Sequence, residues 1–241
     1  MVWVFIGIGL VLAGLFIYWL LVTTEGVFLG RRVVVWLYDR TAHRYDRIKE
    51  FDPADERYLV TIPILEMLGD RRSPLLLDVA TGTGRVPHDL LADQAFTGRI
   101  IGLDASRPML EVAVEKLTAA ITSGQLLLVQ VPAGQLPFPA QTFDAVSCLE
   151  ALEFFPSDEI ALREMVRVLK PGGCLITTRR AGLEGKWFLH RYRPETEFLA
   201  LLKNLGLRGV RTYQWEVGYN LVTGRLPQAV AWPNTHHEHV A

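Results

Sequence analysis

Cysteine is scarce in this sequence, which holds only Cys148 and Cys174 among its 241 residues. Each lies in an apolar stretch typical of a strand, and neither has a partner at the spacing of a zinc site. Buried thiols in a reducing compartment therefore explain the two residues better than a disulfide does. Residues 227–241 include a small group of histidines, but the segment has the character of a flexible tail, so we predict no bound metal.

Neither sign of charge is in excess. The 25 Lys and Arg residues are balanced by 26 Asp and Glu residues, which gives a formal net charge of -1. Proteins that hold the phosphate backbone of a nucleic acid carry a basic surplus, so DNA or RNA is disfavoured as a partner. The length suits one domain of ordinary size with an appendage, and it leaves the oligomeric state open.

Residues 2–22 have no charged side chain at all. A helix over this run would be about 31 Å long, which matches the hydrocarbon core of a bilayer. No basic region precedes the run and no small-residue cleavage pattern follows it, which disfavours a cleaved signal peptide. A core helix that is apolar on every face would need more surrounding protein than this chain supplies. We therefore predict that residues 1–24 form a retained single-pass transmembrane anchor.

Arg31 and Arg32 follow this run, and the positive-inside tendency places the catalytic part of the chain in the cytoplasm. Residues 25–58 are rich in Arg and Asp, and we interpret them as a juxtamembrane helical lead-in. A solvated helix with local ion pairs is the simpler explanation of this segment. A cap over a bound cofactor is the functional alternative.

From residue 59 to residue 226 the pattern is typical of one α/β domain. Buried-strand patterns occur at residues 74–80, 99–103, 126–131, 143–149 and 174–178. Helical patterns occur at residues 59–68, 87–95, 108–123, 158–169 and 195–204. Two alternating runs at 209–217 and 218–224 predict an antiparallel hairpin at the sheet edge. The fold class predicted is α/β, with a doubly wound, mostly parallel, seven-stranded sheet.

A glycine-rich turn follows the first of these strands, in the order Asp78-Val79-Ala80-Thr81-Gly82-Thr83-Gly84. Gly82 and Gly84 allow the backbone to pass close to a ligand. The carboxylate of Asp78 would repel a pyrophosphate, whereas it suits the cationic amino-acid end of a sulfonium cofactor. A dinucleotide fingerprint would also need a glycine where this chain has Pro87. A nicotinamide-dependent oxidoreductase is therefore the weaker alternative.

Two further carboxylate positions follow later strands. Asp104 ends the second strand, where it can accept hydrogen bonds from both hydroxyls of a ribose. Glu150 and Glu153 follow the fourth strand, at the edge of the sheet where substrate should approach. They are either general bases or surface carboxylates that open a helix, so the catalytic residues stay unassigned.

These motifs resemble those of the class I S-adenosylmethionine-dependent methyltransferases. The sequence around Asp78 resembles that of the quinone-precursor C-methyltransferases in particular. The resemblance extends in order through most of residues 38–225, and it also rests on residues 102–110, 136–138, 143–146 and 164–173. It implies a Rossmann-like methyltransferase fold with S-adenosyl-L-methionine as cofactor. It also implies methyl transfer to a small or lipid-like acceptor.

The same resemblance implies which residues hold the cofactor. Asp78, Ala80, Gly82 and Gly84 would surround the methionine portion, Asp104 the ribose, and Ala105 with Met109 the adenine, while Leu149 would border the cofactor. Relatives usually place an acidic residue near the adenine where this chain has Pro132. Backbone groups of Ala133 and Gly134 would hold the adenine instead, with Gln135 as a substitute acceptor. This departure leaves a catalytically inactive, membrane-tethered binding module as a further alternative.

Overall fold

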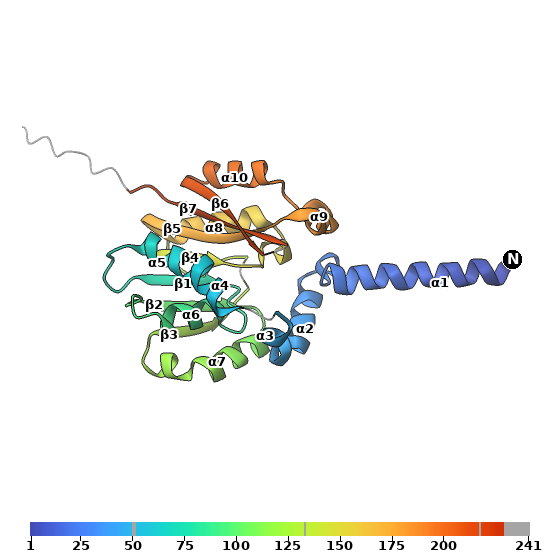
Figure 1. The fold of residues 1–241 in the computed structure, drawn as a ribbon, viewed down its shortest axis with the longest axis horizontal. Helices are drawn as coiled ribbons and strands as arrows, with labels where there is room; N and C mark the ends of the chain where they lie inside the picture. The colour runs from blue at the N-terminus through green and yellow to red at the C-terminus, as the bar shows by residue number, and fades with distance from the viewer. Residues whose placement is uncertain (50–51, 133, 217, 229–241) are drawn as a thin grey trace, which may run out of the picture.

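The computed structural model describes residues 1–49, 52–132, 134–216 and 218–228. A sheet with helices packed on it forms the body of the protein, and one long helix extends away from this body (Figure 1). The histidines of the C-terminal tail and Ala133 lie outside the described residues, so what we predict for them stays a prediction.

The sheet contains seven strands in the order β3-β2-β1-β4-β5-β7-β6. Strands β1 to β5 pair in parallel, whereas β7 is antiparallel to both β5 and β6. The predicted doubly wound, mostly parallel sheet with an antiparallel edge hairpin is therefore confirmed. The strands are β1 Leu75–Val79, β2 Arg99–Asp104, β3 Leu126–Gln130, β4 Phe143–Cys148, β5 Leu169–Arg180, β6 Arg208–Glu216 and β7 Tyr219–Arg225.

Helices cover both faces of the sheet, which explains why its central strands are continuous apolar runs. Side chains of α5, α6 and α7 pack with Leu76 and Ile100 on one face. Side chains of α8 and α10 pack with Leu77 and Val146 on the other face. Both cysteines lie in this core as free, buried thiols. The helices of the domain are α5 Ile62–Leu68, α6 Arg85–Ala92, α7 Arg107–Thr122, α8 Asp158–Val168, α9 Gly182–Gly185 and α10 Glu195–Asn204.

Helix α6 begins at Arg85, two residues before the start that the sequence pattern predicts, and Pro87 lies inside its first turn. Proline is tolerated there because the first backbone N–H groups of a helix have no intrahelical acceptor. Strand β5 is longer than its predicted core of 174–178, because pairing with β4 and β7 continues at both ends. Neither difference moves the carboxyl ends of β1 and β4.

Short helices connect the N-terminal helix to the domain. They are the 3-10 turn Val27–Leu29, α2 Arg31–Thr41, the 3-10 turn Ala42–Arg44, α3 Tyr45–Lys49, α4 Pro53–Glu56 and the π-helical turn Arg57–Thr61. The chain turns sharply before α2 at Gly26, whose φ is +71°. A Cβ atom there would lie 2.9 Å from Leu37 Cδ1, so the turn requires glycine.

The N-terminal helix consists of α1 Val2–Tyr18 and the π-helical turn Trp19–Thr23. Its most apolar window has a mean hydropathy of 2.5 and none of that window is buried, so by length and composition the helix is able to cross a membrane. Figure 1 shows α1 projecting away from the domain, which excludes a core helix. The ring of Trp19 stacks on Phe28 at 5.3 Å and fixes the helix to the turn below it.

Candidate active site

A cavity lies at the carboxyl ends of the central strands, on the side where the chain switches from β1 to β4 in the sheet. Open α/β sheets bind ligands at such a switch point. The cavity encloses about 900 Å³ of space between protein atoms, part of it open to solvent.

The structure brings most of the predicted cofactor residues together around this cavity. Seven of them line it: Ala80, Gly82, Asp104, Ala105, Met109, Gly134 and Leu149. Asp78 lines a smaller adjoining pocket, which shares Ala80, Gly82 and Leu149 with the main cavity. Gly84 lines neither of the two and instead precedes α6 as its N-cap, with a φ of +81°.

Asp78 is nearly fully buried, with 3% of its surface exposed. Its Oδ1 accepts a hydrogen bond from Ser147 Oγ at 2.7 Å, across the β1–β4 pair. Burial raises the pKa of Asp78 to about 6, although hydrogen bonds and Arg85 act in the opposite direction. A cationic group placed beside this carboxyl would stabilise its ionised form.

Asp104 fixes the geometry of the glycine turn. Its Oδ2 accepts from the backbone N–H of Gly82 at 2.9 Å, and its Oδ1 accepts from the N–H of Ser106 at 2.8 Å. The loops after β1 and β2 are therefore held at one carboxylate. The turn also places Ala80 at a φ of +58°, a left-handed conformation that side chains other than glycine rarely adopt.

The lead-in supplies one wall of the cavity. Val34, Val35 and Tyr38 of α2 line it, as does Tyr45 at the start of α3. The rings of the two tyrosines lie 5.9 Å apart, although they belong to separate short helices. The sequence offered a cap over a bound cofactor as one alternative for this segment, but it did not show which side chains form the wall.

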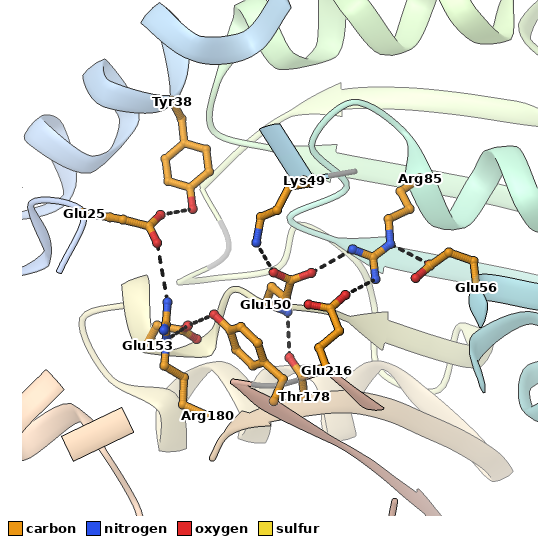
Figure 2. A network of polar contacts seen from close by, with 11 residues as sticks. Glu25, Tyr38, Lys49, Glu56, Arg85, Glu150, Glu153, Thr178, Arg180 and Glu216 are labelled. Carbon is orange, nitrogen blue, oxygen red and sulfur yellow. Dashed lines mark hydrogen bonds and ion pairs between the residues drawn. The ribbon is translucent and has the colours of Figure 1, made fainter. Parts of the chain in front are cut away.

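Arg85 joins the lead-in to the sheet (Figure 2). Its guanidinium contacts Glu56 Oε2 at 2.6 Å, Glu150 Oε1 at 2.7 Å and Glu216 Oε1 at 3.8 Å. The first of these carboxylates comes from α4, the second from the loop after β4 and the third from β6. Sequence analysis missed Arg85 because its partners are distant in the chain.

Glu150 also pairs with Lys49 and is only 7% exposed, so its interpretation as a surface carboxylate is wrong. Two cations allow it to be buried. Burial raises the pKa of Glu150, but Lys49 and Arg85 outweigh that effect and the net pKa is lowered. A carboxylate held in this way is a weak base. Its backbone N–H donates to Thr178 Oγ1 at 2.6 Å, which fixes the rim of the cavity.

Glu153 belongs to a second group of polar contacts, also drawn in Figure 2. It is 6% exposed, so it is not a surface carboxylate either. It accepts from Arg180 Nε at 2.7 Å and from the hydroxyl of Tyr219. Arg180 also pairs with Glu25 at 3.4 Å, and Glu25 accepts from the Tyr38 hydroxyl at 2.6 Å. Glu153 lies outside the cavity lining, so it has no direct access to a substrate there.

Of the residues predicted at the adenine end of the site, Ala133 lies outside the described part of the chain. Pro132 and Gly134 line the cavity, whereas Gln135 is exposed at the surface and is not among the lining residues. The prediction of Gln135 as a substitute acceptor therefore lacks support in the described part of the chain.

Comparisons with solved structures agree with this architecture. The [4+2]-cyclase SpnF superimposes with a TM-score of 0.66 at 21% identity, covering 83% of this chain and 97% of that protein. A putative methyltransferase from Bacillus halodurans gives a TM-score of 0.58 at 20% identity, covering 70% and 100%. At these identities the similarity is one of fold. The fold is the Rossmann-like methyltransferase fold.

Sequence comparison identifies the family. A methyltransferase domain model matches residues 77–177. The ubiquinone/menaquinone biosynthesis C-methyltransferase UbiE of Syntrophotalea carbinolica is 32% identical over 210 residues, which cover 73% of this chain and 86% of that protein. The demethylmenaquinone methyltransferase of Staphylococcus aureus is 29% identical over 180 residues, covering 74% and 73%. The chain belongs to the class I S-adenosylmethionine-dependent methyltransferases, and S-adenosyl-L-methionine is its cofactor.

Proposed function

We propose that this methyltransferase acts on a lipid-like acceptor at the cytosolic face of a membrane, with residues 1–24 as its anchor. The observation that carries the proposal is the wall of the cavity. Val34 and Val35 of α2, the first full helix after the anchor, line the cavity together with Phe154 and Phe155 from the segment after β4. An apolar cavity that begins beside a membrane anchor suits an acceptor dissolved in the bilayer, because tethering raises its local concentration.

The names of the two relatives support an acceptor of this kind, because they describe quinone biosynthesis and demethylmenaquinone methylation. We propose the same broad class of acceptor for this chain, with a small soluble molecule as the competing class. Arg31 and Arg32 follow the anchor and favour a cytoplasmic domain by the positive-inside tendency.

The proposed organisation has four parts: the anchor, a lead-in over residues 25–58, the methyltransferase domain over residues 59–226 and a tail over residues 227–241. The lead-in acts as a cap in this proposal. Its Asp46 accepts from Thr83 in the glycine turn, and its Asp39 accepts from Ser106 beside the adenine region. Contacts at both loops suit a segment that covers the cofactor and excludes water.

The residues present fit the cofactor. Asp78 is buried near the end of β1, half-buried Asp104 ends β2, and the turn between β1 and α6 has a left-handed φ at Ala80, Gly82 and Gly84. We propose that Asp78, Ala80, Gly82 and Gly84 surround the methionine portion, Asp104 the ribose, Ala105 and Met109 the adenine, and Leu149 the edge of the cofactor. The backbone of Ala133 and Gly134 completes the adenine site in this proposal.

When bound, S-adenosyl-L-methionine supplies a methyl group on a good leaving group, so the protein mainly aligns the acceptor with that methyl. Asp78 holds the cationic amino-acid end, and Asp104 fixes the loops that hold the nucleoside. The apolar wall orients the acceptor. Glu150 and Glu153 are both ion-paired, so neither is assigned as a general base.

The test is transfer of radiolabelled methyl from S-adenosyl-L-methionine by the full chain in membranes. A lipid extract and a pool of soluble metabolites are offered in parallel. Label in the lipid phase supports the proposal, and label confined to soluble products refutes the lipid-like acceptor. The variant Asp78→Asn serves as the control for label that does not depend on this site.

A further inference from the structure

The segment formed by α9 Gly182–Gly185 and the 3-10 helix η6 Lys186–Arg191 exposes large apolar side chains. Leu183 is 78% exposed, Trp187 54% and Leu189 59%. Single exposed apolar residues are ordinary on a protein surface, but three within seven positions form a group. A group of this kind marks a surface that contacts another protein or a membrane.

The segment is firmly packed at its centre, so these side chains are held outward. Phe188 is 1% exposed, and the guanidinium of Arg180 lies 4.0 Å from the centre of its ring. Phe188 also meets the ring of Phe154 edge-on at 6.3 Å. Leu189 adopts a φ of +45°, a strained conformation for a branched residue, and its side chain remains exposed.

An ion pair fixes this segment next to the end of the N-terminal helix. Arg180, just before α9, pairs with Glu25, just after the helix that ends at Thr23, at 3.4 Å. Figure 1 shows α9 and α2 on the side of the domain from which α1 extends. If α1 crosses a bilayer, the headgroup region of that bilayer is therefore the nearest large surface to Leu183, Trp187 and Leu189.

The composition of the segment suits that position. Tryptophan is favoured at the boundary between headgroups and acyl chains, and leucine is favoured just below it. Lys186 is exposed between the apolar residues, where an ammonium can reach lipid phosphates.

We infer that segment 182–191 is a second membrane contact, in which Leu183, Trp187 and Leu189 insert into the interface of the bilayer. The inference rests on the proposed function, because it requires the N-terminal helix to be in the membrane. The anchor and this segment together fix the tilt of the domain. Phe154 lines the cavity and packs on Phe188. The two contacts therefore bring Phe154 close to the lipid surface from which the acceptor would come.

The test uses the full chain reconstituted in phosphatidylcholine and phosphatidylglycerol vesicles. Cys148 and Cys174 are buried, so a single introduced cysteine can be labelled selectively with an environment-sensitive fluorophore. Labels are placed by Trp187→Cys and Leu183→Cys in the segment, by Phe5→Cys in the anchor and by Tyr213→Cys on β6. A phosphatidylcholine with a doxyl quencher near its headgroup reports insertion.

The expected result is strong loss of fluorescence at positions 183, 187 and 5, with little loss at 213. Quenching at position 5 together with values at 183 and 187 as low as at 213 would overturn the second contact and leave the anchor intact. Failure to quench at position 5 would overturn the anchor itself, and with it this inference. The three outcomes therefore separate the inference from the proposed function.

A second measurement removes the apolar group. The triple variant Leu183→Ser, Trp187→Ser, Leu189→Ser is compared with Leu127→Ser, Ile160→Ser, Tyr213→Ser, which changes three exposed apolar residues elsewhere. Protection of the segment from a soluble protease by vesicles should be lost only in the first variant. Equal protection in both variants would contradict the inference. Unchanged binding of S-adenosylhomocysteine shows that each variant is folded.

Discussion

The Oε1 atom of Glu150 lies 2.7 Å from Arg85 Nη1, and this ion pair joins the loop after β4 to the first residue of α6. Lys49 of the lead-in contacts the other oxygen of the same carboxylate. Three segments that are distant in sequence therefore meet at Glu150, which lines the cavity together with Leu149. The pair fixes the relation between the glycine turn, the rim of the cavity and the lead-in.

We expect Glu150→Gln to lower the free energy of unfolding by about 3 kcal/mol, because removing one partner of a buried ion pair leaves uncompensated charge. The side chains of Glu150 and Arg85 are only 4% and 13% exposed. Denaturant titration of the full chain in detergent measures the change. The matched control is Glu159→Gln, whose pair with Arg163 is exposed and should contribute about 0.5 kcal/mol or less. Equal losses in the two variants would contradict the prediction.

The pKa of Asp78 predicts how cofactor binding depends on pH. Burial raises this pKa to about 6, and the cationic amino-acid end of a ligand would favour the ionised form. Affinity for S-adenosylhomocysteine should therefore rise as the pH approaches 6 from below, by up to about tenfold per pH unit, and then become level. Calorimetry at several pH values measures this. A flat profile would show that Asp78 does not bind the charged end.

The same pKa predicts the effect of Asp78→Asn on stability. A carboxyl whose pKa is raised on folding stabilises the fold at low pH, and this contribution is lost as the pH rises through about 6. The variant should therefore be more stable than the natural chain above pH 6 by roughly 1 to 3 kcal/mol, while it binds product about tenfold more weakly. Asp70→Asn, at an exposed position, should change neither quantity.

Gly84 offers a test of local packing at the glycine turn. A Cβ atom there would lie 2.7 Å from Leu117 Cδ1 and 3.2 Å from Ala113 Cβ, in addition to the unfavourable φ of +81°. Gly84→Ala should lower the free energy of unfolding by about 3 kcal/mol. Gly124 has a similar φ of +76° with open space around it, so Gly124→Ala should cost only about 1 kcal/mol. Similar losses in denaturant titration would exclude the clash with α7.

Gly84 also illustrates what sequence patterns can and cannot predict. Its spacing after Asp78 correctly placed a turn between a strand and a helix, because buried strands and glycine turns are encoded locally. The pattern did not reveal that Gly84 packs against α7 rather than lining the cavity, since Ala113 and Leu117 are distant in sequence. The bounds of α10 were predicted to the residue, because proline precedes the helix and its apolar spacing is regular.

The polar contacts were the main feature that sequence reasoning did not recover. Glu150 and Glu153 were correctly placed after β4, but their burial depends on Lys49, Arg85 and Arg180, which no local pattern connects. The lead-in was predicted as helical in character, yet its contacts with the cavity depend on how the short helices fold back. Pairings of this kind are properties of the tertiary structure.

The aromatic side chains that line the cavity should affect the KM for the acceptor without affecting the KM for the cofactor. Phe154 lines the cavity and meets the ring of Tyr38 edge-on at 5.7 Å. We expect Phe154→Ala to raise the KM for acceptor in a titrated lipid extract by about tenfold, because it removes an apolar contact worth about 1.5 kcal/mol or more. The KM for S-adenosyl-L-methionine should stay within about twofold, since the proposed cofactor residues apart from Leu149 lie on other loops. The control is Phe138→Ala, a partly buried phenylalanine that packs on Phe143 and does not line the cavity. This control should lower stability and leave both KM values unchanged. A parallel rise of the acceptor KM in both variants would mean that general loosening of the fold, and not the loss of a wall, explains the effect.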